Sequence, residues 1–219
     1  TVRLTDALNG DITLANVQAG ITSLRLDDGA TGAEAATFET GSKSIDLRGD
    51  LTGATTFVIG GTATDDALSV STAGAASSVN AINGQNLATT GVETLSINTS
   101  GTGAATAQTI GTVTMTASTG GTTAFNLSGG NSVTVGAITA GTVDFSGVTA
   151  AAGVAMGTPV GAATITGSQG ADTLVAAATG STISGGAGID DITGAAGNDT
   201  ITGGAGNDTI DALGGTDSV

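Results

Sequence analysis

Hydrophobic and polar positions alternate along most of the chain, in short runs that end at Gly, Ser, Thr or Asn. In "SLRL" (23–26) and "SVTV" (132–135) every second residue is aliphatic. Alternation of this kind predicts half-buried β-strands, because successive side chains of a strand point to opposite faces. Comparable runs predict further strands at 44–47, 56–59, 68–70, 95–97, 112–118, 124–127, 142–145 and 163–166.

From residue 124 the predicted strands recur about every nine to eleven residues, and from residue 167 the interval is a constant nine. The nine-residue units begin at 167, 176, 185, 194, 203 and 212. Position eight of each unit is aliphatic: Leu174, Ile183, Ile192, Ile201, Ile210 and Val219. Position six is acidic in all units but the second, where Ser181 stands: Asp172, Asp190, Asp199, Asp208 and Asp217.

A nine-residue unit with one aliphatic position and a Gly-rich turn is too short for an antiparallel hairpin, and its period is not that of a helix. One short strand and one tight turn per unit remain, so that two units form one coil. Coils that stack at about 4.8 Å give two parallel sheets, with the position-eight residues filling a thin interior. The turns need positive φ, which glycine adopts most readily, and Gly188, Gly197 and Gly206 recur at that point.

Stacked coils place position-six side chains of alternate units above one another, Asp172 with Asp190 and Asp208 on one edge and Asp199 with Asp217 on the other. Two carboxylates about 5 Å apart repel by roughly 3 kcal/mol at an effective dielectric constant of 20. No basic side chain is available to neutralise them, because the net charge is −15 and no Lys or Arg follows Arg48. The roll therefore needs a cation.

The chain has no His and no Cys, which excludes the usual zinc ligands. Carboxylate and carbonyl oxygens in flexible turns suit Ca²⁺, whereas Mg²⁺ demands a strict octahedron. The scarcity of aromatic side chains and the absence of Lys and Arg after Arg48 also argue against a nucleic-acid partner.

The segment "GGAGIDDITGAAGNDTITGGAGNDTID" (185–211) resembles the G-G-x-G-x-D-x-U-x nonapeptide of the RTX (repeats-in-toxin) family. The resemblance implies a right-handed parallel β-roll with each Ca²⁺ held between stacked turns by Asp carboxylates and turn carbonyls. It also implies type I secretion from a Gram-negative bacterium. The implied metal-site residues are Asp172, Gly185, Gly188, Asp190, Gly194, Gly197, Asp199, Gly203, Gly206, Asp208 and Asp217.

Three ions or more are expected, in the pairs Asp172–Asp190, Asp190–Asp208 and Asp199–Asp217. The Ser181–Asp199 position is expected to be empty or weakly occupied, since a hydroxyl is a neutral ligand and Ala176 and Ala177 replace the opening glycines. Affinity in the range of about 10⁻⁴ to 10⁻³ M, typical of extracellular modules, is expected.

The organisation expected is an all-β chain in two parts, a Thr/Ala/Gly-rich β-solenoid over residues 1–166 and the RTX β-roll over 167–219. A separate β-sandwich over residues 1 to about 120 has the same strand pattern and is the alternative. The chain begins at Thr1 without a signal sequence or a membrane span, so it is interpreted as a fragment.

A weaker metal candidate is Asp66 in "GTATDDALS" (61–69), where Asp66 and Leu68 occupy positions six and eight of a degenerate nonapeptide. A polar turn is the simpler interpretation. The stretch "LDDGATGAE" (26–34) lacks the ligand spacing of an EF-hand. Lys43 and Arg48 are expected on a solvated face.

No catalytic constellation is encoded, because the chain lacks His, an HExxH motif and a G-x-S-x-G elbow. Glu93 and Asp144 are isolated carboxylates and are expected at exposed or loop positions. The protein is therefore expected not to be an enzyme.

The favoured function is structural: a calcium-stabilised subunit of a surface layer or extracellular matrix, which assembles with copies of itself. The chain resembles RTX-bearing surface-layer proteins of Gram-negative bacteria, and missing parts of the chain could contact cell-surface polysaccharide. A segment of an RTX adhesin or ice-binding solenoid is the first alternative, suggested by Thr112 to Thr116, although such Thr residues do not recur in one register of the sequence. The non-catalytic tail of a secreted hydrolase or toxin is the second.

Overall fold

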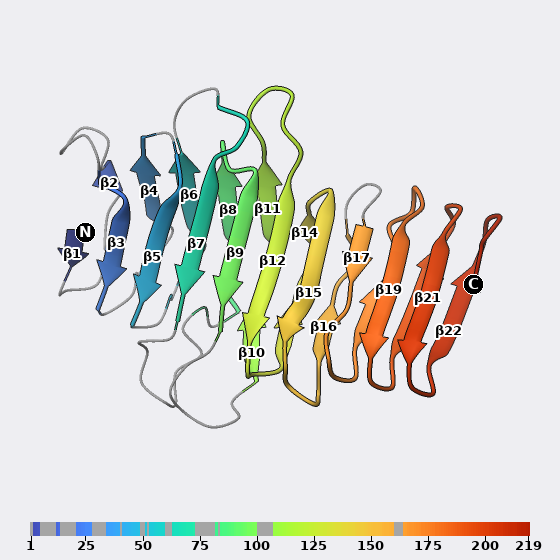
Figure 1. Cartoon of the computed structure of the whole chain (residues 1–219). Helices are drawn as coiled ribbons and strands as arrows, with labels where there is room; N and C mark the ends of the chain where they lie inside the picture. The colour runs from blue at the N-terminus through green and yellow to red at the C-terminus, as the bar shows by residue number, and fades with distance from the viewer. Residues whose placement is uncertain are drawn as a thin grey trace.

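A computed structural model of the chain describes residues 2–4, 12–13, 21–27, 34–39, 41–48, 51, 53–59, 63–72, 82, 84–99, 107–159 and 164–219. The described residues form strands and turns without a helix, and every strand pairing is parallel. Each coil adds one strand to a ten-stranded sheet, the front sheet, and returns on the other side of the molecule (Figure 1). The predicted parallel β-solenoid is thus confirmed.

The front sheet has the order β1 (Val2–Leu4), β3 (Ser23–Leu26), β5 (Lys43–Leu47), β7 (Ala67–Ser71), β9 (Thr94–Asn98), β12 (Ala124–Gly129), β15 (Thr142–Val148), β17 (Thr164–Thr166), β19 (Thr182–Ala187) and β21 (Thr200–Ala205). Behind its N-terminal part lie β2 (Ile12–Thr13), β4 (Glu34–Phe38), β6 (Thr55–Ile59), β8 (Leu87–Thr90), β11 (Val113–Thr116) and β14 (Ile138–Thr139). Behind its C-terminal part lie β10 (Gln108–Ile110), β13 (Val133–Val135), β16 (Val154–Met156), β18 (Thr173–Val175), β20 (Asp191–Ala195) and β22 (Thr209–Leu213).

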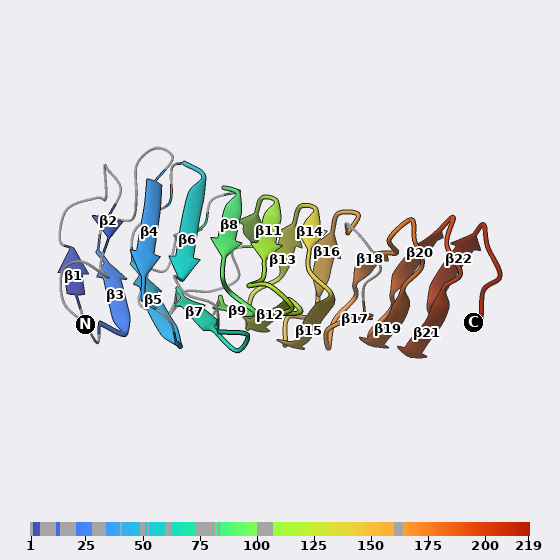
Figure 2. The same ribbon diagram turned by 90° about the horizontal axis from the view of Figure 1, so that it is seen from above.

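The hand of the solenoid follows from two views of the ribbon. The front strands run downward in Figure 1, while the strands behind them run upward. Figure 2, seen from above, shows the front strands and the strands behind them as two separate layers. The chain advances from the N-terminal to the C-terminal end as it circulates in this sense, so the coil is right-handed, as the family resemblance implies.

Two front strands lead into coils with a third strand. The coil that begins at β9 continues through β10 and β11, and the coil that begins at β12 continues through β13 and β14. In each of these coils one strand (β10 or β13) belongs to one back sheet and the next (β11 or β14) to the other. The cross-section therefore has three sides here, instead of the two that the repeat pattern predicts. From Ile165 onward each coil has two strands, and Ile165 pairs with Ile183 and Ile183 with Ile201 at an interval of 18 residues.

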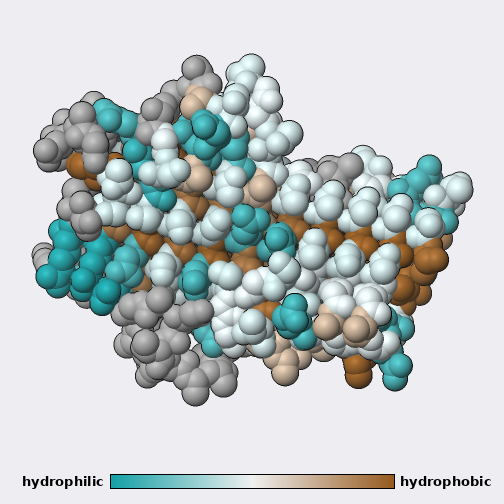
Figure 3. Space-filling view, in the orientation of Figure 1, coloured by the Kyte–Doolittle hydropathy of each residue, from teal (hydrophilic) through white to brown (hydrophobic). Residues whose placement is uncertain are grey.

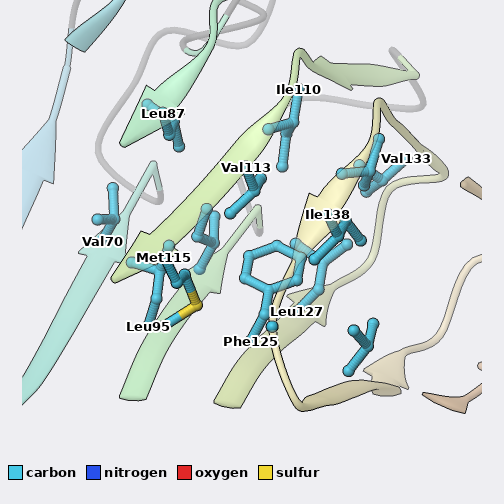
Figure 4. Close-up of a cluster of buried hydrophobic side chains, with 14 of the residues drawn as sticks. Val70, Leu87, Leu95, Ile110, Val113, Met115, Phe125, Leu127, Val133 and Ile138 are labelled. Atoms are coloured by element: carbon cyan, nitrogen blue, oxygen red, sulfur yellow. The ribbon is translucent and has the colours of Figure 1, made fainter. Parts of the chain in front are cut away.

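The core is a stack of aliphatic columns between the layers, part of which Figure 4 shows. One column runs along the front sheet through Leu68, Leu95, Phe125, Val143, Ile165, Ile183 and Ile201. Phe125 also packs edge-on against Phe145, with ring centroids 6.3 Å apart. Burial of apolar surface contributes about 25 cal/mol per Å², so this column stabilises the non-RTX coils without a metal.

The predicted position-eight interior is confirmed for Leu174, Ile183, Ile192 and Ile201, which are buried. Val219 was predicted to be interior as well, and this is wrong, because it is 74% exposed. Leu213 is exposed as well, and apolar residues are visible at that end of the molecule in Figure 3.

Two further expectations concern charged side chains near the N-terminus. Arg48 bonds Asp46 at the surface, as expected for a solvated face, whereas Lys43 is only 7% exposed. Lys43 opens β5 at an inward position, directly beside Leu68 of β7, and so does not lie on a solvated face.

Asp27 belongs to the stretch that lacks EF-hand spacing. It accepts hydrogen bonds from Arg3 and Arg25. Although desolvation alone would raise the pKa of Asp27, these bonds lower it.

The part of the chain that the structure describes contains no helix with the length and apolarity that crossing a membrane requires.

Candidate calcium sites

The position-six residues occupy two edges of the roll. Three of them directly precede a back strand and lie on the lower edge in Figure 1, and we call this set the lower ladder: Asp172, Asp190 and Asp208. The other three directly precede a front strand or the bridge that extends it, and we call them the upper ladder: Ser181, Asp199 and Asp217. Residues of one ladder are therefore 18 positions apart, as the two-units-per-coil geometry predicts.

Two hydrogen bonds connect successive members of each ladder, and we call this arrangement the ladder motif. The backbone N–H of Asp190 donates to Oδ1 of Asp208 at 3.0 Å, while the carbonyl of Asp190 accepts from Thr209 N at 2.8 Å. The same N–H to carboxylate bond joins Asp172 to Asp190 at 2.9 Å and Asp199 to Asp217 at 2.9 Å. The motif occupies Oδ1 of the accepting carboxylate and leaves Oδ2 for another partner.

Asp190 lies in the middle of the lower ladder and is 1% exposed. Its Oδ2 atom is buried and accepts no hydrogen bond. Burial raises the pKa of Asp190, and the neighbouring carboxylates of Asp172 and Asp208 raise it further against the lowering effect of the Asp172 N–H. A buried carboxylate oxygen without a partner, between two like charges, is a position that a cation would stabilise.

The turns before these residues have two conformations. In the open turn, position two has a positive φ: 110° at Gly186, 111° at Gly204 and 61° at Leu213. In the closed turn, position two instead donates its N–H to the position-six side chain. These bonds run from Ser168 to Asp172 Oδ2 at 2.5 Å, from Ala177 to Ser181 Oγ at 2.9 Å and from Ala195 to Asp199 Oδ2 at 3.1 Å.

A closed turn occupies the carboxylate oxygen that a metal would otherwise take. Asp172 is the extreme case, because it also accepts from Ser168 Oγ at 2.7 Å and from Val154 N at 2.6 Å. Open turns flank both carboxylates only in the Asp190–Asp208 pair. In the described roll this pair is therefore the predicted site best prepared to bind an ion. The Asp172–Asp190 and Asp199–Asp217 pairs each combine one open with one closed turn.

The repeat glycines serve two different needs. Gly188 and Gly206 have the expected positive φ, 130° and 145°, but the expectation is wrong for Gly197, which belongs to a closed turn. Gly197 is required for a different reason, because a Cβ there would collide with the backbone of Gly180. Opening glycines also lie against neighbouring chain: a Cβ at Gly185 would meet the Gly203 carbonyl, one at Gly203 the Asp208 carboxylate, and one at Gly194 the Ala212 carbonyl.

Ser181 interrupts the row of carboxylates in the upper ladder. It lies beside an open hollow of about 310 Å³ that is lined by polar residues, among them Thr179, Thr182 and Asn198. Only one carboxylate, Asp199, faces this turn, through the 2.7 Å bond from Ser181 N. Weak or absent ion binding at this position stays a prediction. Among the described residues no three acidic side chains converge, so each candidate site offers two carboxylates and relies on backbone carbonyls for the rest.

Two carboxylates outside the repeats have unexpected surroundings. Asp66, the weaker candidate, is 1% exposed and directly precedes β7. Glu93 was expected to be isolated and exposed, which is wrong: it is 5% exposed and accepts a hydrogen bond from Asp66 N. One sequence feature could have indicated this burial. Leu95 follows Glu93 by two residues, which is the same spacing that separates the aliphatic residue from the Asp in each repeat. Asp144 is partly buried in β15 and accepts from Ser146 N.

Comparison with known families identifies the repeats at residues 184–219. Residues 184–219 match the RTX calcium-binding nonapeptide repeat in four copies. The match begins later than residue 167 because the first two units depart from the motif at Ser168, Ala176, Ala177 and Ser181. No curated protein and no solved structure matches the chain. Residues 184–219 are thus RTX repeats, a motif that binds calcium, at one end of a longer parallel solenoid.

Proposed function

We propose that this calcium-binding RTX-type solenoid is an extracellular structural protein, a subunit of a surface layer or matrix of a Gram-negative bacterium. It leaves the cell unfolded through type I secretion, and Ca²⁺ outside the cell folds and rigidifies the RTX coils. The subunits then associate with copies of themselves. The chain carries no catalytic activity of its own. RTX repeats are typical of secreted Gram-negative proteins, which supports the location.

The observation that carries the proposal is the continuity of the front sheet. The RTX strands β19 and β21 extend, in the same parallel register, a sheet that begins at β1. Ordering the last coils by calcium therefore lengthens a rod that already has an apolar core, instead of folding a separate module. A rigid rod whose end depends on calcium suits a lattice subunit, and calcium is also the natural counter-ion for a chain of net charge −15.

Electron microscopy of the purified chain tests the proposal. We expect ordered two-dimensional arrays after addition of millimolar Ca²⁺ and none in chelator. A variant with Asp190→Asn and Asp208→Asn, which removes both charges of the best-prepared site, should assemble only at higher Ca²⁺. Particles that stay monodisperse at every Ca²⁺ concentration would contradict a lattice role.

An ice-binding or adhesive solenoid is the second candidate, and one observation favours it. Thr142, Thr164, Thr182 and Thr200 pair in one register on the front sheet and are all exposed. These residues therefore form a column with the strand spacing of about 4.8 Å, in which Thr164, Thr182 and Thr200 follow the 18-residue period and Thr142 does not. Thermal hysteresis of the calcium-loaded chain tests this candidate, with Thr182→Lys expected to abolish it.

A further inference from the structure

An acidic pair lies outside the RTX repeats, on the edge where the front strands begin. Asp66 directly precedes β7 and Glu93 directly precedes β9, and these strands are neighbours in the front sheet. Both side chains are buried, with exposed fractions of 1% and 5%. Burying two carboxylates side by side costs free energy unless a positive charge or hydrogen bonds compensate them.

The backbone joins this pair by the ladder motif of the RTX coils. Asp66 N donates to Oε2 of Glu93 at 3.1 Å, and the carbonyl of Asp66 accepts from Thr94 N at 3.1 Å. Asp190 and Asp208 are connected by the same two bonds. The differences are an interval of 27 residues instead of 18 and a Glu in place of the second Asp.

The two oxygens of Asp66 differ in their surroundings. Oδ1 accepts a hydrogen bond from Gly41 N at 2.5 Å, whereas Oδ2 is buried and accepts none. Among the described residues, the only other carboxylate oxygen in this state is Oδ2 of Asp190, in the middle of the lower ladder. The unpartnered oxygen of Asp66 is therefore the counterpart of Oδ2 of Asp190, the atom that calcium would use in the repeats.

The carboxylate of Glu93 accepts a backbone hydrogen bond at each of its oxygens. Ser118 N donates to Oε1 of Glu93 at 2.6 Å, and the buried Ser118 hydroxyl oxygen has no partner. The turn closes tightly here, since a Cβ on Gly121 would lie 2.8 Å from Oε1. The ligands on offer are carboxylate, hydroxyl and carbonyl oxygens without nitrogen or sulfur, which is the set that Ca²⁺ prefers.

We propose that Asp66 and Glu93 bind a Ca²⁺ ion outside the RTX repeats, with Oδ2 of Asp66 as a direct ligand. The ion neutralises the buried pair and fastens the β7 coil to the β9 coil. Lys43 is the other source of positive charge on this side of the molecule, since it pairs with Leu68, two residues beyond Asp66. An ammonium group in contact with Asp66 would make the pair indifferent to calcium, and the experiment separates the two cases.

Counting bound ions tests the proposal on the full chain at saturating Ca²⁺, by native mass spectrometry and equilibrium dialysis. Asp66→Asn keeps the acceptor for Gly41 N but removes the charge, and we expect it to bind one ion fewer than wild type, as should Glu93→Gln. Asp65→Asn is the matched control, because Asp65 is exposed and the charge change is identical. Its count should equal that of wild type. Counts equal to wild type in both Asp66→Asn and Glu93→Gln would overturn the proposal.

A second measurement does not depend on how well the variants fold. Crystals of the wild-type chain grown with Ca²⁺ should show an anomalous-scattering peak at about 2.3–2.6 Å from Oδ2 of Asp66. The absence of a peak there, with calcium present in the RTX turns, would overturn the proposal. In that case an ammonium group against Oδ2 would identify Lys43 as the partner of Asp66.

Discussion

Asp190 shares its environment with two other carboxylates, because the lower ladder places Asp172 and Asp208 one coil away on either side. Each carboxylate inside a ladder can therefore serve two ions, whereas one at the end of a ladder serves a single ion. The energetic importance of a ligand then depends on its position in the column as well as on its own turn.

We predict that Asp190→Ala raises the Ca²⁺ concentration needed for folding more than Asp217→Ala does. Asp190 contributes to two stacked pairs and Asp217 to one. At a Ca²⁺ concentration 100 times the dissociation constant, each lost ion removes about 2.7 kcal/mol of stability. Circular dichroism during a Ca²⁺ titration measures the midpoints.

The control for this comparison is Asp191→Ala, the exposed neighbour of Asp190, which should leave the midpoint unchanged. Equal midpoints for Asp190→Ala and Asp217→Ala would mean that ions do not bridge turns 18 residues apart.

Acid should partly replace calcium in the metal-free roll. The pKa of Asp190 is raised by burial and by its acidic neighbours, so the folded state holds a proton that the unfolded chain, with a pKa of about 3.9, holds less tightly. This contribution to stability is complete below the unfolded value and is lost as the pH rises through the folded one. In chelator, resistance to urea should therefore increase from pH 7 toward about pH 4, with a smaller increase in Asp190→Asn. A pH dependence identical in both chains would assign the effect to other carboxylates.

At the scale of the turn, the backbone at position two distinguishes the open from the closed conformation. Gly186, Gly204 and Leu213 have the positive φ of the open turn, whereas position two of each closed turn donates its N–H to the position-six side chain. The conformation of one residue thereby sets whether a carboxylate is offered to a metal or satisfied by its own backbone.

We predict that Gly204→Ala weakens calcium-dependent folding. Ala in the left-handed region costs roughly 1–2 kcal/mol, and its Cβ would also collide with the Gly186 carbonyl of the preceding coil. Gly214→Ala is the matched control, because its φ is not positive and the nearest atom to its Cβ would be 3.9 Å away. Calcium titrations should show a higher midpoint for Gly204→Ala alone. A similar shift in both variants would point to general loss of chain flexibility.

On the scale of the whole molecule, stability is supplied differently at the two ends. The coils from β9 to β15 contain Phe125, Leu127, Val143 and Phe145, which are all buried, whereas the RTX coils contribute a single small aliphatic residue per strand and a column of charges. The first part can hold its structure through apolar burial, while the second requires calcium to offset the repulsion of its carboxylates.

Hydrogen exchange on the full chain should therefore divide in chelator. We expect amides of residues 164–219 to lose protection when calcium is removed, because calcium binding supplies folding free energy there. Amides of β12 and β15 should keep their protection, because these strands cover an apolar core and hold no proposed ion. Mass spectrometry of peptic fragments resolves the two regions. Uniform loss of protection would show that the solenoid folds as one cooperative unit with its calcium.

Much of the RTX end could be predicted from the sequence alone. A constant period of nine, with Ile192 at position eight and Asp190 at position six, admits one stacking register, so the interior column, the two ladders and the pairs of carboxylates all follow from counting. The strands at 23–26 and 124–127 were likewise visible, because alternation is a local property of the chain.

Tertiary structure alone decided what lies between coils of unequal length. Asp66 and Glu93 are 27 residues apart, and Leu95 and Phe125 are 30, intervals without a period from which to count. The packing of apolar residues in the interior columns determines which strands are neighbours, and the loops between these strands differ in length. For the same reason the sequence could not show that Thr142 joins the Thr column, or that two coils have three sides. It could not separate open from closed turns either, since that choice depends on whether a backbone N–H finds its carboxylate four residues on.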